Sequence, residues 1–150
     1  MVKYPEKLKI DRNAWLWKPI YKKVFAKNQQ FACVFSGKPG SGKSYTSLAI
    51  AELFYPNIDV SESVFFTPKD FAKKVSEKLP KGYPLIMDDA GLSIHSSEAM
   101  GKEIRAISKT LQSIRHRNCL VFLTVPSLAL LAKSTRILSD YYCQPYAFSA

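Results

Sequence analysis

From Phe31 onward, short apolar runs alternate with stretches in which apolar residues recur every three or four positions. Short apolar runs are typical of buried strands, and the longer spacing is typical of amphipathic helices. Strands are expected at residues 31–36, 64–67, 85–88, 119–124 and 141–148, the last interrupted by Pro145. Helices are expected at residues 43–54, 68–79, 97–116 and 127–133. This alternation predicts an α/β fold with a mainly parallel five-stranded sheet sandwiched between helices.

The longest expected helix, at residues 97–116, has two distinct faces. At about 100° per residue, apolar side chains form one stripe and basic or polar side chains gather opposite. The apolar stripe contains Met100, Ile104, Ile107, Leu111 and Ile114. The opposite side contains Lys102, Arg105, Lys109, Gln112 and His116. We expect the first face to pack on the sheet and the second to present positive charge to solvent or a partner.

Residues 1–30 form a basic, aromatic N-terminal extension to a core at residues 31–150. A proline disfavours the helical conformation in the residue before it, so a helix here is expected to begin near Pro19. The large apolar residues of this segment could cover the core, contact a neighbouring subunit or stack on bases, and we favour core cover. They are Trp15, Leu16, Trp17, Ile20, Tyr21, Val24 and Phe25.

A glycine-rich turn follows the first expected strand. Its sequence, Gly37-Lys38-Pro39-Gly40-Ser41-Gly42-Lys43-Ser44, fits the phosphate-loop pattern Gly-x-x-x-x-Gly-Lys-Ser/Thr in full. Glycines let backbone N–H groups approach phosphate oxygens, and the helix beginning near Lys43 directs its positive end at the same place. In this pattern the lysine contacts the β- and γ-phosphates and the Ser44 hydroxyl binds Mg²⁺. The sequence therefore predicts a P-loop NTPase that binds ATP and Mg²⁺, with Tyr45 as a further nucleotide-binding residue.

An acidic residue at the tip of a neighbouring strand is the second part of such a site. The apolar run at residues 84–87 leads directly into Asp88 and Asp89. Asp88 is expected to support the magnesium shell, commonly through water. Asp89 is expected to orient or deprotonate the attacking water.

Thr124 and a few arginines are further catalytic candidates near strand or helix ends. Thr124 ends the fourth expected strand and could sense the γ-phosphate or hold the attacking water; the alternative is that it caps the helix expected after Pro126. Arg136, and the group around Arg115 and Arg117, are candidates for an arginine finger that acts on a neighbouring subunit's site. Contact with a phosphate backbone and plain exposure are the alternatives for each arginine.

The net charge of +10 is concentrated in two segments. Residues 1–30 contain eight lysines and arginines against two acids, and residues 101–118 contain five against one. Localised positive charge is the expected footprint of a polyanion, with DNA as the first candidate and a solubilising surface as the alternative. The candidate contact residues are Lys102, Arg105, Lys109, Arg115 and Arg117.

Other features of the sequence limit the choice of cellular compartment. No stretch approaches the ~18 uninterrupted apolar residues that a membrane span needs, and the N-terminus lacks the apolar run of a signal peptide. Cys33, Cys119 and Cys143 are widely spaced and lack paired Cys or His neighbours, which favours buried thiols over a disulfide or a zinc site. A cytoplasmic protein is therefore expected.

With these motifs, the chain resembles the additional-strand P-loop ATPases over roughly residues 31–148. Within that group it is most similar to the FtsK/HerA and Zot-like motor proteins of phages, archaeal viruses and plasmids. The resemblance rests on residues 37–44, 85–91 and 111–124, with Arg136 in a place similar to that of a family arginine. Two positions differ, because Asp89 stands where the family usually has Glu, and Val125 where it often has Gln.

The resemblance implies an oligomeric ATPase, in a ring or filament, that acts on DNA with viral, plasmid or replication partner proteins. Translocation, packaging and mobile-element transfer are the processes expected for such a motor. The Asp-Asp pair is more similar to helicase loaders of the DnaC type, and a nucleotide-gated loader or adaptor with little turnover is the alternative. Those loaders carry a helical lid after the core, whereas this sequence ends soon after the fifth strand, which favours the motor. A small-molecule kinase is a third hypothesis, disfavoured because no acceptor site or Arg-rich lid is recognisable.

Overall fold

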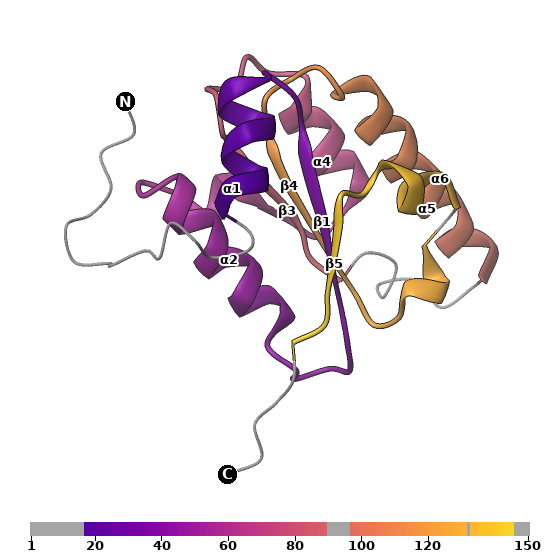
Figure 1. Cartoon of the computed structure of the whole chain (residues 1–150). Helices are drawn as coiled ribbons and strands as arrows, with labels where there is room; N and C mark the ends of the chain where they lie inside the picture. Colours follow the sequence, from indigo (N-terminus) through magenta and orange to yellow (C-terminus); the bar gives the residue numbers. More distant parts are fainter. Residues whose placement is uncertain (1–16, 90–96, 132, 146–150) are drawn as a thin grey trace, which may run out of the picture.

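A computed structural model describes residues 17–89, 97–131 and 133–145 of the chain. Five parallel strands form one sheet in the order β2-β3-β4-β1-β5 (Figure 1). The strands are β1 (Phe31–Ser36), β2 (Val64–Phe65), β3 (Pro84–Met87), β4 (Leu120–Val125) and β5 (Tyr141–Cys143). The predicted α/β class and five-stranded parallel sheet are confirmed.

Helices cover both faces of the sheet (Figure 1). One face carries α1 (Trp17–Ile20), its π-helical continuation η1 (Tyr21–Ala26), and α2 (Lys43–Phe54). The other face carries α4 (Pro68–Val75), α5 (Ser97–Ser113) and α6 (Lys133–Leu138). Two short elements, α3 (Val60–Ser63) and the 3-10 turn η2 (Leu128–Leu130), lie in the connections. In the described part of the chain, no helix combines the length and the apolar character that crossing a membrane requires.

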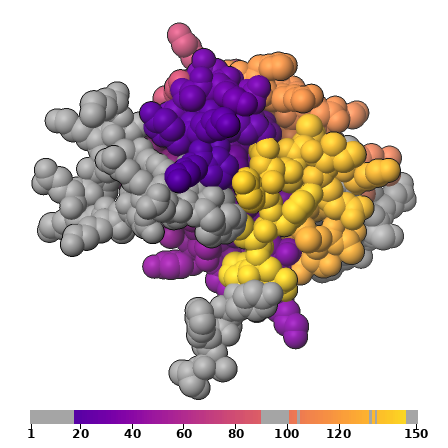
Figure 2. Space-filling model, in the orientation of Figure 1, coloured from indigo at the N-terminus to yellow at the C-terminus, as the bar shows by residue number. Residues whose placement is uncertain are grey.

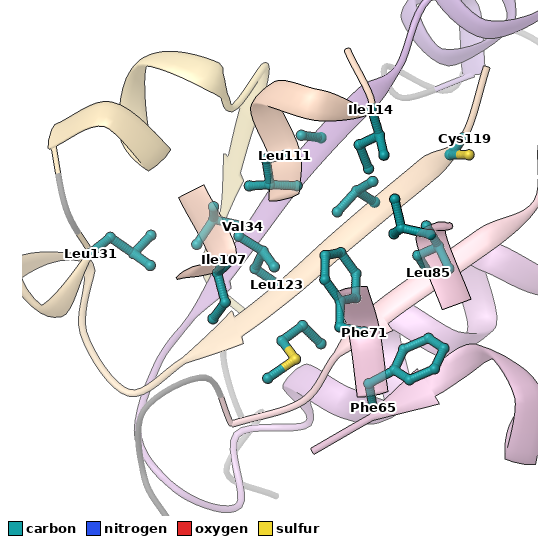
Figure 3. Packing of buried hydrophobic residues seen from close by; sticks show 14 of the residues in the cluster. Val34, Phe65, Phe71, Leu85, Ile107, Leu111, Ile114, Cys119, Leu123 and Leu131 are labelled. Carbon is teal, nitrogen blue, oxygen red and sulfur yellow. The ribbon is translucent and has the colours of Figure 1, made fainter. Parts of the chain in front are cut away.

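The sheet divides the hydrophobic core in two, because alternate side chains of a strand point to opposite faces. On β1, Val34 joins the cluster under α4 and α5, whereas Phe35 joins the cluster under α1, η1 and α2. Figure 3 shows the first cluster, in which Phe71 of α4 and Leu111 of α5 pack towards Leu123 of β4. The strands β1, β3 and β4 are buried along their whole length, as expected for a parallel sheet covered on both faces.

The apolar stripe of α5 packs on the sheet as predicted. Ile107, Leu111 and Ile114 are all buried in the first cluster. The side chains of Met100 and Ile104 lie outside the described part of the chain. On the other side of the helix, Lys102, Arg105, Lys109, Gln112 and His116 are all exposed.

The N-terminal helical segment belongs to the core. Ile20 and Val24 are fully buried against residues of β1 and α2, which confirms core cover for these two positions. The Phe25 ring lies against Gly82, where an added Cβ would come within 2.7 Å of the ring. The described helix begins at Trp17, two residues before the expected start at Pro19. A proline is tolerated there because the first N–H groups of a helix have no intrahelical partner.

The other helix bounds show where local pattern fails. The helix predicted at residues 127–133 is wrong, because the chain makes the single turn η2 and continues, after buried Leu131, into α6. The Ser127 hydroxyl accepts a hydrogen bond from the Ala129 N–H and caps that turn. The helices expected at residues 68–79 and 97–116 end earlier, at Val75 and Ser113.

Two strands are shorter than predicted, and the short helix α3 was not expected. β2 is an edge strand and pairs only with β3, so it has two residues instead of the four predicted at 64–67. β5 ends at Cys143, and the predicted continuation at residues 146–148 lies outside the described residues. The unexpected helix α3 is capped by Asp59, whose carboxylate accepts from the Ser61 N–H at 2.9 Å.

The cysteines are free thiols, with Cys33 and Cys119 buried and Cys143 half-buried. Adjacent strands β1 and β5 bring the Sγ atoms of Cys33 and Cys143 to 3.4 Å. Their spacing in the sequence gave no sign of this contact, because it depends on which strand pairs with β1.

Candidate functional site: a glycine-rich turn and two strand tips

The glycine-rich turn directly follows β1 at the carboxyl end of the sheet, where ligands bind in open parallel sheets. The Gly37 N–H donates to the Val125 carbonyl at 3.3 Å, and the Ser41 N–H donates to the Lys38 carbonyl at 3.1 Å. Gly42 precedes α2 with a φ of 84°, a left-handed conformation that glycine adopts without steric cost. The turn therefore leads directly into α2, whose first N–H groups have no intrahelical partner and are suited to an anion.

Lys43 lies in the first turn of α2 and is 6% exposed. Its ammonium group donates to the carbonyls of Gly37 at 2.8 Å and Lys38 at 3.0 Å. The side chain therefore runs back along the turn, and its charge lies among the backbone groups that the pattern assigns to phosphate binding.

Ser44 and Asp88 meet although 44 positions separate them in the sequence. The Ser44 hydroxyl donates to Asp88 Oδ1 at 2.5 Å. Asp88 follows β3, and its N–H donates to the Phe65 carbonyl of β2 at 2.8 Å, which anchors the strand tip. Mg²⁺ that binds substrate phosphates usually takes only a few oxygen ligands from the protein, and water completes its shell. A hydroxyl and a carboxylate beside a glycine-rich turn are suited to that role.

Thr124 connects the two acidic residues. Its hydroxyl donates to Asp88 Oδ1 at 2.7 Å and accepts from the Asp89 N–H at 2.7 Å. The residue is fully buried in β4, which lies between β1 and β3. The alternative that Thr124 caps the following helix does not apply, because Ser127 is the residue that caps η2.

Asp89 has an unusual backbone and an exposed side chain. Its φ is 47°, in the left-handed region that Asp visits more readily than most residues. The Thr124 hydroxyl binds the N–H of this residue and so supports that conformation. The chain thus turns sharply after Asp88, and the Asp89 carboxylate is left exposed beside the strand tip.

The other residues of the turn are mostly exposed. Lys38, Pro39 and Gly40 are exposed, and Tyr45 is 80% exposed in the first turn of α2. The Ser41 hydroxyl oxygen is buried without a hydrogen-bond partner within the described residues. A buried polar atom without a partner is costly, so this hydroxyl is suited to contact a ligand.

Two of the candidate arginines, Arg115 and Arg117, lie away from this site within one chain. Arg115 follows α5, and its carbonyl accepts from the Gln30 N–H just before β1 begins. The six residues of β1, roughly 20 Å at the usual strand rise, separate this end of the sheet from the glycine-rich turn. Arg117 donates from its two terminal guanidinium nitrogens to the carbonyls of Val75 and Glu77, at and just after the C-terminal end of α4. Arg136 is exposed on α6.

The structure thus brings together Lys43, Ser44, Asp88, Asp89 and Thr124, and leaves Arg115 and Arg117 at the other end of the sheet. Sequence reasoning did not anticipate that two carbonyls of the turn bind Lys43. That contact involves backbone atoms, which leave no mark on residue type. Among the described residues, no three His, Cys, Asp or Glu side chains gather to form a metal site.

Comparisons with known proteins identify no family for the chain, so its interpretation depends on the geometry of the site. No protein-family model matches the chain, and no curated protein sequence matches it.

Proposed function

We propose that the chain binds and hydrolyses ATP in the presence of Mg²⁺. The observation that carries the proposal is the contact between Ser44 Oγ and Asp88 Oδ1, at 2.5 Å, directly after Lys43 and the glycine-rich turn. A phosphate cradle, a lysine, a hydroxyl and a strand-tip carboxylate are the parts that phosphoryl transfer from ATP requires. The buried Ser41 hydroxyl adds a polar atom suited to a ligand.

Each residue has a role in this proposal. The N–H groups of the turn and of α2 bind the triphosphate, and Lys43 exchanges the carbonyls of Gly37 and Lys38 for the β- and γ-phosphates. Ser44 and Asp88 hold Mg²⁺, which neutralises phosphate charge and orients the triphosphate when it is bound. Asp89 orients or deprotonates the attacking water, and Thr124 positions Asp88 and Asp89 through its two hydrogen bonds.

The sheet order supports a relation to the additional-strand ATPases. β4 intervenes between the strand that enters the glycine-rich turn and the strand that ends at Asp88. This strand carries Thr124 to a place where its hydroxyl reaches both acidic residues.

We further propose that the ATPase is an oligomeric, DNA-associated motor of viral or plasmid type. The exposed side chains of Lys102, Arg105 and Lys109 on α5 support contact with phosphate groups of DNA. The exposed position of Arg136 on α6 is compatible with action on a neighbouring subunit.

Replacement of Lys43 tests the ATP site. Lys43→Ala removes the charged group that the pattern assigns to the β- and γ-phosphates, and we expect at least a hundredfold loss of Mg²⁺-ATP affinity or turnover. Lys78→Ala is the matched control, because Lys78 is exposed and lies after α4, away from the turn. Affinity is measured by titration calorimetry and turnover by phosphate release; unchanged values in Lys43→Ala would reject this site.

A nucleotide-gated loader or adaptor with little turnover is the second candidate. Its supporting observation is the short, exposed Asp89 side chain, which must reach the attacking water from a sharply turned backbone. Tight ATP binding with no more than one phosphate released per chain, with or without DNA, would favour this candidate over the motor.

A further inference from the structure

A cavity of about 400 Å³ opens at the amino end of the sheet, at the opposite end from the glycine-rich turn. The N-terminal helical segment and the segment from α6 to β5 adjoin on this side of the molecule (Figure 2). The volume is within the range of small-ligand sites, ~300–1,000 Å³. The lining residues are Lys23, Gln29, Gln30, Arg115, His116, Ile137, Leu138 and Asp140.

The single acidic residue of the cavity is already engaged. One carboxylate oxygen of Asp140 accepts from the Lys23 ammonium group, and the other accepts from the Ala32 N–H at 2.9 Å. Asp140 therefore organises the wall of the cavity, and its charge is balanced by Lys23. The net positive character of the cavity comes from Arg115.

Three other polar side chains of the cavity are not engaged. Gln30 is 5% exposed, and its Oε1 atom is buried without a partner within the described residues. In the same part of the chain, no hydrogen bond or ion pair engages the guanidinium of Arg115 or the imidazole of His116. A buried carbonyl oxygen without a donor is costly, and a ligand N–H or O–H would satisfy it.

These groups together define the chemistry of a ligand. Arg115 and His116 offer N–H donors to an oxyanion, and the Gln30 amide offers an acceptor beside a donor. Ile137 and Leu138 add an apolar wall. A nucleoside phosphate has all three complementary parts, since its phosphate matches the guanidinium, its base edge matches an amide and its ring matches an apolar surface.

Exposed basic residues of α5 precede the cavity residues Arg115 and His116 along the chain. Lys102, Arg105 and Lys109 are exposed along one side of α5, and Arg115 and His116 follow the C-terminal end of that helix. A free mononucleotide would use the cavity alone, whereas a polynucleotide strand would use the cavity and the exposed side of α5 together.

We propose that this cavity binds one nucleotide unit of a polynucleotide strand, with a phosphate against Arg115 and His116 and a base edge against Gln30. The inference rests on the DNA-binding part of the proposed function and gives that contact a location. It is independent of the ATP site, which lies at the other end of the sheet.

Binding of a short fluorescein-labelled oligodeoxyadenylate to the full chain, followed by anisotropy without ATP, tests the proposal. We expect Arg115→Gln to weaken binding roughly tenfold and to lower the salt dependence by about one phosphate contact. Gln30→Leu is expected to weaken binding roughly fivefold with an unchanged salt dependence, because the amide carries no charge. A purely structural role of Gln30 or Arg115 would not produce this difference between the two salt slopes.

Lys22→Gln is the matched control, because Lys22 is exposed on η1, does not line the cavity and removes one positive charge. It is expected to change affinity less than twofold. Thermal unfolding checks that Gln30→Leu is folded, and His116→Ala, at an exposed position, gives a second test if it is not. Deoxyadenosine monophosphate is expected to compete much more weakly than the strand.

Two results would overturn the inference. In the first, the single variant Arg115→Gln binds the strand within twofold of the parent, and so does one of the single variants Gln30→Leu and His116→Ala. The other is competition by the free mononucleotide as strong as that by the strand. ATP hydrolysis, measured separately without DNA, reports on the proposed function, so the failure of one proposal is distinguishable from the failure of the other.

Discussion

Asp88 Oδ1 accepts hydrogen bonds from two hydroxyls that come from different elements, Ser44 of α2 and Thr124 of β4. The carboxylate thus joins the glycine-rich turn, β3 and β4 at one atom. Thr124 contributes a second bond by accepting from the Asp89 N–H. A change at Thr124 is therefore expected to affect both acidic residues at once.

Thr124→Val tests this link at the scale of a single hydroxyl. Valine has nearly the same shape, but it leaves the Asp89 N–H without an acceptor and Asp88 with one donor fewer, at a cost of about 1–3 kcal/mol. We expect a loss of stability of that size in urea unfolding and at least tenfold slower ATP turnover. Thr124→Ser keeps the hydroxyl and should restore most of both. Equal turnover in the valine variant and the parent would contradict a positioning role.

Cys119 gives a prediction about pH. Burial raises the pKa of its thiol to about 11, against 9.0 for an exposed thiol. The folded chain therefore keeps this proton while the unfolded chain loses it, so stability is fully present below pH 9 and falls between pH 9 and pH 11. The shift corresponds to roughly 3 kcal/mol at its full extent.

The comparison for this prediction is Cys119→Ala. Below pH 9 the substitution should lower stability by an amount that does not depend on pH, and above pH 9 it should flatten the fall relative to the parent. Urea unfolding at several pH values between 8 and 11 measures both curves. Parallel curves for the two proteins would show that this thiol does not contribute.

At the scale of elements, the segment α1–η1 is expected to unfold together with the rest of the chain. Val24 is fully buried between this segment and the sheet. Val24→Ala should lower the free energy of unfolding by about 1–3 kcal/mol, because it removes buried methyl groups. Lys22→Ala, on the exposed side of the same segment, should change it by less than about 0.5 kcal/mol. A separate early transition that alone responds to Val24→Ala would contradict a shared core.

The bounds of the helices and strands also show which features a local sequence pattern can predict. The bounds of β1 and α2 follow from local signals, since an apolar run leads into glycines that fix the start of the helix. The short η2 turn and α6 could not be separated by pattern, because a buried Leu131 between them has the same apolar character as a helix residue.

In the candidate site, too, some residues could be predicted from local sequence pattern, whereas some contacts depend on the arrangement of the strands. Lys43, Ser44 and Asp88 are marked by residue type and position, so the sequence predicted that they would share one site. The contact of Thr124 with the Asp89 N–H depends on β4 lying between β1 and β3, and strand order is not encoded in any local pattern. The distance of Arg115 from the turn follows from the direction of the strands and was likewise not available from the sequence.

At the scale of the whole molecule, a mixing experiment tests action between subunits. If Arg136 completes the site of a neighbour, Arg136→Ala should lower ATP turnover by about 10³-fold or more. An equal mixture of Arg136→Ala and Lys43→Ala should regain part of the activity, because an intact turn then meets an intact arginine. Lys133→Ala, exposed on the same helix, is the control.

The mixture also separates the explanations of an Arg136 effect. Activity that does not rise on mixing, or an Arg136→Ala variant as active as the parent, would remove this arginine from the proposed mechanism. Turnover per chain that increases with protein concentration would independently support an oligomer.

The bonds of Lys43 to the carbonyls of Gly37 and Lys38 have a consequence for the thermodynamics of binding. They are made within the chain, so the conformation of the turn does not depend on a phosphate to fold it. The loss of backbone entropy, about 1–2 kcal/mol for each residue fixed, then occurs during folding and not during association. Nucleotide binding to a turn that is already folded is expected to show only a small entropic penalty from ordering of the chain, and the exchange of the two Lys43 bonds for phosphate contacts adds an enthalpic cost.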